Sequence, residues 1–385
     1  MDKIGRTLFM LLLCTAMGLY MLSVAGSADN GESKPMTQMK QKNVPKHDGR
    51  LHNKNFDFGP KNIYSLEETP GLAVPEDLWD DLPEQLQEVP LTHQLRILVI
   101  GNSFNQDTMA YVPPILNEIL PDYEITYAVL YTGSADLDKH LSYWENVYYY
   151  TLNYWGPGDK SWSRDITTID EILEMDNWDI VMTQATSSDV LSNDRIQNKI
   201  LRPAQRLLDK LQTSASKPIL PVWVQWVGRP ESSFGCAEMT HKITDAAKTV
   251  IAETDFFDFI PIGTAIQSAR TNATINNLGG GGELLHRDRV HLAAGLPDLI
   301  ASYTTVQKIL EWTGNGHLSV RGSSFRPADE ECVRIGACWS GSSEVRMTHG
   351  DSVGVTEELV LAAQEIAMMA VENPTEVTNC ADILG

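Results

Sequence analysis

The stretch Leu95-Arg96-Ile97-Leu98-Val99-Ile100-Gly101-Asn102-Ser103 decides the fold. Its first six residues are mostly apolar and partly β-branched, a composition that indicates a strand buried on both faces of a parallel sheet. Gly101 ends the run. In open α/β sheets, reactive groups collect beyond the carboxyl ends of the strands, so Ser103 is placed where chemistry is expected.

Further short apolar runs follow this strand, and segments with helical spacing separate them. The predicted strands lie at 125–131, 178–183, 219–224 and 257–260, and the predicted helices at 109–120, 166–175, 194–211, 240–254, 296–312 and 356–371. This alternation predicts an α/β fold with a doubly wound, mostly parallel sheet and helices on both faces. The glycine run 279–282 is expected to be a loop, because it cannot hold a helix or strand interior.

A serine becomes a nucleophile when a base lies beside it and a third group orients that base. Downstream, Asp288 stands three residues before His291, a spacing that lets the carboxylate reach back to the imidazole. A serine such as Ser103, taken alone, is more often a turn or helix-cap residue. A histidine such as His291, taken alone, is more often structural or on the surface. Their combination predicts a Ser-His-Asp triad.

These residues resemble the SGNH, or GDSL-type, hydrolase superfamily. Gly101-Asn102-Ser103-Phe104 is similar to its first block, normally Gly-Asp-Ser, and Asp288-x-x-His291 to its last. The chain looks most like the SGNH-like family DUF4886. Further similarities are GNSFNQD at 101–107, WDIVMTQ at 178–184, IPIGTAIQ at 260–267 and HRDRVHL at 286–292. The resemblance covers roughly 95–314 and implies a flavodoxin-like SGNH hydrolase fold.

The resemblance also implies an oxyanion hole. By position, the N–H groups of Ser103 and Gly133 supply two donors, although Gly133 reads equally well as a plain strand-end turn. Gln184 stands where the superfamily has an asparagine, and its longer carboxamide can still donate an N–H. Asn102, Trp226 and His140 are further candidates for substrate contacts, with a surface position as the ordinary alternative for His140.

Two other groups of residues have competing interpretations. His286, Asp288 and His291 carry metal-ligand atoms, but no companion carboxylate is identifiable, so no metal is predicted. The segment 143–162 holds eight Tyr and Trp residues, which either form a platform for sugar rings or pack in the core and its rim, as is commoner.

The N-terminal part predicts export. Residues 1–25 resemble a signal peptide, with Lys3 and Arg6 before an apolar run and small residues at 23–25. An uncleaved anchor is the lesser alternative. Residues 26–92 are expected to be a flexible tether and lead-in, 93–314 the hydrolase domain, and 315–385 a C-terminal extension with one amphipathic helix. A secreted, periplasmic or cell-surface location follows from the signal.

The net charge limits which partners are expected, and the cysteine content bears on disulfide bonds. The formal net charge is -21, so the protein repels phosphate backbones, and nucleic acid and membrane surfaces are not expected partners. Removal of the signal peptide leaves four cysteines, which form one or two disulfides or remain thiols. They are Cys236, Cys332, Cys338 and Cys380.

Together these features predict an exported serine esterase that needs no cofactor and hydrolyses carboxylic esters, with acetyl groups on glycans as the expected substrate. The alternatives are a lipid or short-chain carboxylesterase, and a catalytically silent glycan-binding protein that keeps the fold. The presence of Asn102 in place of aspartate favours the silent alternative, because it departs from the superfamily pattern.

Overall fold

The computed structural model describes residues 93–226, 237–276, 285–286, 291–327 and 355–378, all of which belong to one compact unit. Their centre is a seven-stranded sheet with the strand order β4-β3-β2-β1-β5-β6-β7. The strands are β1 His93–Gly101, β2 Tyr123–Tyr131, β3 Tyr150–Trp155, β4 Ser163–Thr167, β5 Ile180–Thr183, β6 Leu220–Val224 and β7 Asp258–Ile260.

Five of these strands run parallel, in the order β2-β1-β5-β6-β7. The order reverses at β1, which lies between β2 and β5, as in doubly wound sheets. Such a reversal opens a crevice outside the carboxyl ends of the strands, and β1 ends there at Gly101. The predicted fold class is therefore confirmed.

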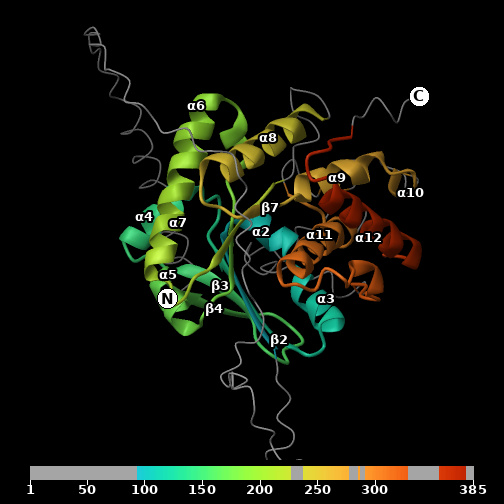
Figure 1. The fold of residues 1–385 in the computed structure, drawn as a ribbon, viewed down its shortest axis with the longest axis horizontal. Coiled ribbons are helices and arrows are strands. Elements are labelled where there is room, and N and C mark those ends of the chain that lie inside the picture. The colour runs from blue at the N-terminus through green and yellow to red at the C-terminus, as the bar shows by residue number, and fades with distance from the viewer. Residues whose placement is uncertain (1–92, 227–236, 277–284, 287–290, 328–354, 379–385) are drawn as a thin grey trace, which may run out of the picture. The chain divides into compact units, whose positions relative to one another are not determined.

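Helices cover both faces of the sheet, and β1 shows why (Figure 1). Its odd-numbered residues Leu95, Ile97 and Val99 enter one core, and Leu98 and Ile100 enter the other. The first core includes α2 Ser103–Thr108, α3 Val112–Ile119, α9 Ile262–Thr271, α11 Leu296–Trp312 and α12 Glu357–Glu372. The second includes α4 Leu137–Glu145, α5 Ile169–Met175, α7 Arg202–Ser214 and α8 Glu238–Glu253.

Strands β3 and β4 are absent from the sequence prediction; β3 pairs antiparallel with β2, and β4 pairs antiparallel with β3. A sequence signal for β3 was available: aromatic residues at 150–155 favour a strand, and Gly156-Pro157-Gly158 is a turn signal directly after it. The predicted helix 166–175 starts later, at Ile169, because Thr168 and Glu171 form a capping box.

Proline affects two of the predicted helices. The predicted helix 109–120 corresponds to α3, which begins at Val112 with Pro113 in its first turn, whereas α2 lies before it and was not predicted. The predicted helix 194–211 runs through α6 Asn193–Arg195 and a π-helical stretch, Ile196–Leu201, before α7. Pro203 lacks the N–H that an α-helical turn would use there. The predicted helices 240–254, 296–312 and 356–371 correspond closely to α8, α11 and α12.

Several predictions fall outside the described residues: the signal peptide and tether, the four cysteines, the loop 279–282 and Asp288. Among the residues that are described, no helix combines the length and the apolar character that a membrane span requires.

Candidate active site

Ser103 lies at the turn between β1 and α2, at the carboxyl edge of the sheet. Asn102 caps α2 through its side chain, and Ser103 is the first helical residue, where the backbone N–H has no partner within the helix. Gly101 makes the turn possible, because a Cβ atom there would overlap the fully buried Asn105 side chain. Ser103 itself is partly exposed.

His291 is brought to Ser103 from 188 residues along the chain. The Ser103 Oγ and His291 Nε2 atoms lie 2.7 Å apart, which is hydrogen-bonding distance. The residues that follow His291 are anchored: Leu292 forms a bridge with His286, and the Ala293 N–H donates to the Leu285 carbonyl at 3.0 Å. Since Leu285 and Leu292 are buried, the imidazole stands on anchored backbone.

A row of aromatic rings supports this pair. The Phe104 ring meets the His291 ring edge-on at 5.4 Å and stacks on Trp226 at 3.8 Å with an interplanar angle of 2°. Trp226 follows β6, so the row connects the ends of β1 and β6 beneath the imidazole. Phe104 contacts one edge of the His291 ring, and a histidine that accepts a proton from a serine needs a fixed ring orientation.

The sequence suggested Asn102 as a substrate contact. Its side chain is instead buried, 2% exposed, and hydrogen-bonded to protein atoms. Its Oδ1 accepts from the Phe104 N–H at 3.0 Å and from the Gln184 amide at 2.8 Å, and its Nδ2 donates to the Ala135 carbonyl at 2.8 Å. One carboxamide thus joins the nucleophile turn, the end of β5 and the turn after β2. An aspartate could not make the last of these bonds, because an ionised carboxylate only accepts.

The two remaining residues predicted for the oxyanion hole lie in segments that this carboxamide contacts, Gln184 at the end of β5 and Gly133 in the turn after β2. Gln184 is buried and uses one amide N–H on Asn102. Gly133 stands two residues after β2, and its carbonyl accepts from the Lys139 ammonium at 2.8 Å. The Thr132 N–H bonds to the Gly101 carbonyl at 3.2 Å, which joins this turn to the nucleophile strand. That Gly133 and Gln184 donate to an oxyanion stays a prediction.

The acid of the predicted triad, Asp288, lies outside the described residues, so its role stays a prediction. Nearby, His286 is buried, and its Nε2 lies 3.3 Å from the Arg270 guanidinium. Burial lowers the pKa of Arg270 to about 10, which still leaves it cationic near neutral pH. His286 therefore faces a positive charge, a poor arrangement for a metal ligand.

The prediction that His140 contacts substrate is wrong, as is its alternative of a surface position. Its side chain is 0% exposed, and its Nδ1 lies 3.1 Å from the Tyr150 hydroxyl in the second core. Burial, with a smaller contribution from Lys139, lowers the pKa of His140 to about 3. The sequence could not show this burial, because α4, which carries His140, was not predicted.

The aromatic segment 143–162 divides between packing and surface. Trp144, Tyr150 and Trp155 are buried, as core packing requires, whereas Tyr148 and Tyr149 are 54% and 61% exposed. Because Thr151 pairs with Tyr131, and Tyr131 pairs with Gly101, the two exposed tyrosines lie at the same edge of the sheet as Ser103.

Sequence reasoning missed Phe104, Ala135 and Arg270 as parts of the site. Phe104 stood inside the quoted motif, so an aromatic directly after the nucleophile was the available signal. Ala135 contributes only its backbone carbonyl, which every residue has, so the sequence carries no signal for it. Arg270 was hidden because basic side chains are rarely buried.

Comparison with known proteins bears on the fold. No family model matches the chain, and no curated protein matches it either. Among solved structures, it is similar to a DUF4886 family protein from Bacteroides uniformis, with 20% identity, a TM-score of 0.57, and coverage of 75% of this chain and 99% of that one.

Two further solved structures are more distant. A putative SGNH hydrolase from Slackia heliotrinireducens is 18% identical, with a TM-score of 0.36 over 56% of this chain and 99% of its own. A putative arylesterase from Agrobacterium tumefaciens is 12% identical, with a TM-score of 0.32 over 56% and 99%. Of these three structures, the one from Bacteroides uniformis has a TM-score above 0.5, and it supports the α/β fold expected from the sequence.

Proposed function

We propose that this protein is an exported serine esterase that hydrolyses short acyl esters, acetyl being the smallest, carried on glycans. The observation that carries the proposal is the 2.7 Å separation between Ser103 Oγ and His291 Nε2. A serine hydroxyl at this distance from an imidazole, at the switch point of a doubly wound sheet, is the arrangement that acyl transfer requires.

In the proposed mechanism, Ser103 Oγ attacks the ester carbonyl while His291 Nε2 takes the hydroxyl proton. Asp288 orients the imidazole and balances its charge. The N–H groups of Ser103 and Gly133, with the amide of Gln184, hold the negative oxygen of the tetrahedral intermediate. The intermediate expels the alcohol, which receives the proton from His291, and a water molecule then releases the acid by the same two steps.

The exposed tyrosines support a glycan as the alcohol part of the substrate. Tyr148 and Tyr149 lie at the edge of the sheet that holds Ser103, on the β3 side. Two strand spacings of about 4.8 Å separate β3 from β1, so the tyrosines stand roughly 10 Å from the β1 end. Aromatic faces at this distance suit a sugar ring next to the esterified one.

A fluorophosphonate probe, which reacts with activated serines, tests the proposal. The wild-type protein is expected to be labelled, and Ser103→Ala is not. His291→Ala should also lose labelling, because the hydroxyl then has no base. A folded wild-type protein that stays unlabelled would support the silent glycan-binding protein instead.

Acetate release then tests the substrate. Acetylated xylan is compared with a short-chain aryl ester, and Tyr148→Ala/Tyr149→Ala is compared with the wild type. We expect the double variant to lose activity on the polymer and to retain it on the aryl ester. Equal loss on both substrates would contradict the glycan assignment.

A further inference from the structure

Arg270, near the end of α9, is a cation buried close to the segment that carries the proposed base. Its side chain is only 3% exposed, and burial lowers its pKa to about 10, so it stays charged near neutral pH. Burial of a charge costs free energy unless polar partners surround it. The contacts of the guanidinium therefore show what this charge does in the fold.

The guanidinium joins α9 to residues on both sides of His291 in the chain. Its Nη1 donates to Gln267 Oε1 at 2.7 Å, and its Nη2 lies 3.3 Å from His286 Nε2. Because a guanidinium only donates, His286 accepts through Nε2 and is the neutral tautomer with its proton on Nδ1. His286 also forms the bridge with Leu292, the residue that follows His291. Two contacts thus connect the cation to the backbone beside the proposed base.

Gln267 holds the guanidinium from the helix side. It is 0% exposed, and its amide N–H donates to the Thr378 carbonyl at 2.9 Å. The Thr271 hydroxyl of the same helix donates to the Thr378 hydroxyl at 3.3 Å. Since the amide N–H is directed at Thr378, the amide oxygen of Gln267 faces the guanidinium in one orientation.

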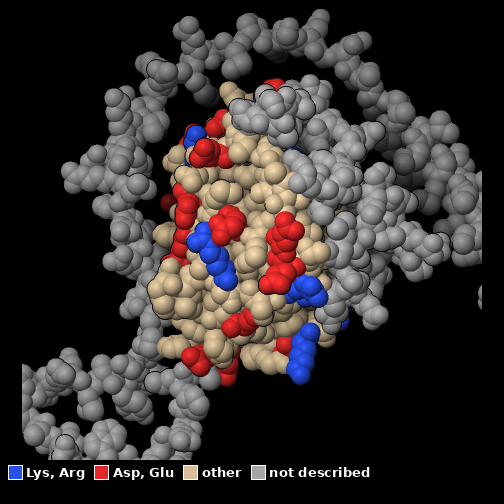
Figure 2. Space-filling model, turned by 90° about the vertical axis from the view of Figure 1, so that its right-hand side faces the viewer, with Lys and Arg blue, Asp and Glu red and all other residues tan. Residues whose placement is uncertain are grey.

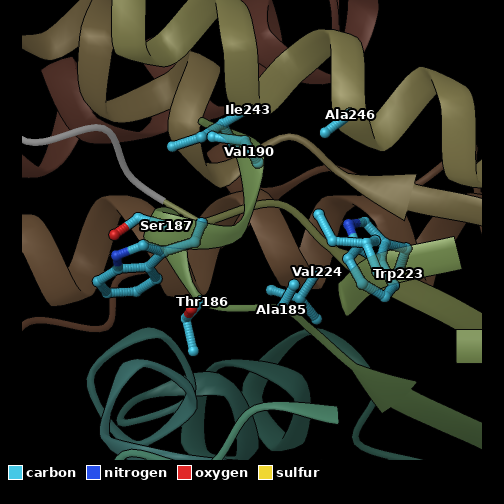
Figure 3. A pocket seen from close by; sticks show the side chains of 10 residues that line it. Ala185, Thr186, Ser187, Val190, Trp223, Val224, Ile243 and Ala246 are labelled. Carbon is cyan, nitrogen blue, oxygen red and sulfur yellow. The ribbon is translucent and has the colours of Figure 1, made fainter. Parts of the chain in front are cut away.

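Separate contacts fix α9 on the serine side of the site. The Thr264 N–H donates to Gln225 Oε1 at 3.1 Å. Gln225 directly precedes Trp226, which stacks on Phe104 at 3.8 Å. Trp226 and Val224 line a small hollow between the ends of β5 and β6 and helix α8 (Figure 3). None of these contacts uses the guanidinium, so its removal leaves the serine side of the site in place.

We infer that Arg270 is a positioning residue for His291. It holds His286, and through the bridge to Leu292 the backbone beside the imidazole, so that the ring stays at hydrogen-bonding distance from Ser103. The inference rests on the proposed esterase function and adds a residue that acts on the base without contact with the substrate. Because His291 transfers a proton in both acylation and deacylation, its displacement slows both steps.

The variants Arg270→Met and Arg270→Lys test this inference in the full-length protein. Arg270→Met removes both bonds, and we expect kcat on p-nitrophenyl acetate to fall roughly tenfold to a hundredfold, the loss that follows from a displacement of about 1 Å. KM should stay near the wild-type value, because the serine side of the site is unchanged. Arg270→Lys keeps a cation that can donate and should recover part of the lost kcat. A kcat for Arg270→Met equal to that of the wild type would overturn the inference.

Lys308→Met is the matched control. Lys308 is also a buried cation, 8% exposed, but it pairs with Asp258 at the start of β7, at 2.7 Å. Its replacement should lower the unfolding temperature and leave kcat near the wild-type value when kinetics are measured well below that temperature. A fall in kcat as large as that of Arg270→Met would assign the effect to general loosening of the core and reject a positioning role.

The pair Gln267→Leu and Gln267→Glu keeps the test open if Arg270→Met does not fold. Neither side chain donates to the Thr378 carbonyl, because leucine is apolar and an ionised carboxylate only accepts. Glutamate still accepts from the guanidinium, whereas leucine does not. We therefore expect kcat of Gln267→Leu to be about tenfold below that of Gln267→Glu. Equal kcat values in the two folded variants would contradict the role of Arg270.

Labelling with the fluorophosphonate probe distinguishes failure of this inference from failure of the proposed function. A wild-type protein that is not labelled overturns both. If the wild type is labelled and hydrolyses esters, but the Arg270 and Gln267 variants keep its kcat, the positioning role fails and the esterase function stands.

Discussion

The Asn102 carboxamide joins three segments, and its Nδ2 bond to the Ala135 carbonyl explains why an asparagine stands here. In Asn102→Asp, an acceptor would face that carbonyl at a site that is 2% exposed. We predict a loss of about 2–4 kcal/mol in the free energy of unfolding at pH 7.5. The loss should shrink in acid, where a protonated carboxyl can donate to Ala135.

Urea unfolding at pH 7.5 and pH 4.5 checks this prediction. Asn177→Asp is the matched control, because Asn177 is exposed and its side-chain oxygen accepts from Ser216. We expect the control to change stability by less than about 0.5 kcal/mol. Equal effects of the two substitutions would show that the Asn102 contacts do not hold the three segments together.

The burial of His140 leads us to predict that the stability of the protein depends on pH. Because burial lowers its pKa from 6.5 to about 3, the folded protein keeps it neutral while the unfolded chain protonates it below pH 6.5. Protonation of the unfolded chain therefore leaves the free energy of unfolding unchanged above pH 6.5 and lowers it as the pH falls toward 3. The expected fall between pH 7 and pH 4 is on the order of 3 kcal/mol.

The variant His140→Gln removes this titration and should flatten the dependence of unfolding free energy on pH between 7 and 4. His241→Gln serves as the control, since His241 is exposed on α8. If His140→Gln keeps the full acid sensitivity of the wild type, His140 is not its source.

At the scale of elements, the bridge between His286 and Leu292 lies directly beside His291, the proposed base. Leu292 is fully buried next to His291, and Leu310 of α11 is equally buried in the same core. We predict that Leu292→Ala and Leu310→Ala each cost about 2–5 kcal/mol of stability. Only Leu292→Ala should also lower kcat, roughly tenfold to a hundredfold, because the imidazole shifts.

Steady-state kinetics on a short aryl ester, below the unfolding temperature of both variants, measures the difference. A comparable fall in kcat for Leu310→Ala would mean that general loosening of the core, rather than placement of His291, limits turnover.

The elements that sequence predicts well are those with a continuous or periodic apolar pattern along their whole length. The run at 95–100 is buried on both faces, and α11 was placed at its observed bounds. Strand β4 was not predicted, because four of its five residues are exposed and leave no apolar pattern to detect. The Ser103 and His291 pair followed from the motifs, whereas the contact between Asn102 and Gln184 depends on how β1 and β5 lie side by side.

At the scale of the whole molecule, acidic residues outnumber basic ones, 51 to 30. On the face that Figure 2 shows, acidic side chains are spread out rather than gathered in one patch. Among the described residues of the whole molecule, some acidic side chains are paired, as Glu365 is with Arg321. The net charge of -21 creates a field that opposes anionic substrates and that salt screens over about 10 Å at 0.1 M.

We therefore predict that kcat/KM for an aryl ester that bears a carboxylate on its alcohol part rises with NaCl between 10 mM and 500 mM, relative to a neutral ester of the same acyl group. The neutral ester controls for effects of salt on the enzyme itself. A ratio of the two kcat/KM values that does not change with salt would show that the field does not reach the entrance of the site.

The separation of 188 residues between Ser103 and His291 has a consequence for synthesis. In a growing chain Ser103 is made early, yet His291, its proposed proton acceptor, is made only after the sheet strands. We therefore expect reactivity toward an organophosphorus probe to appear late in synthesis, when long-range contacts are complete, so that its onset reports the completion of folding.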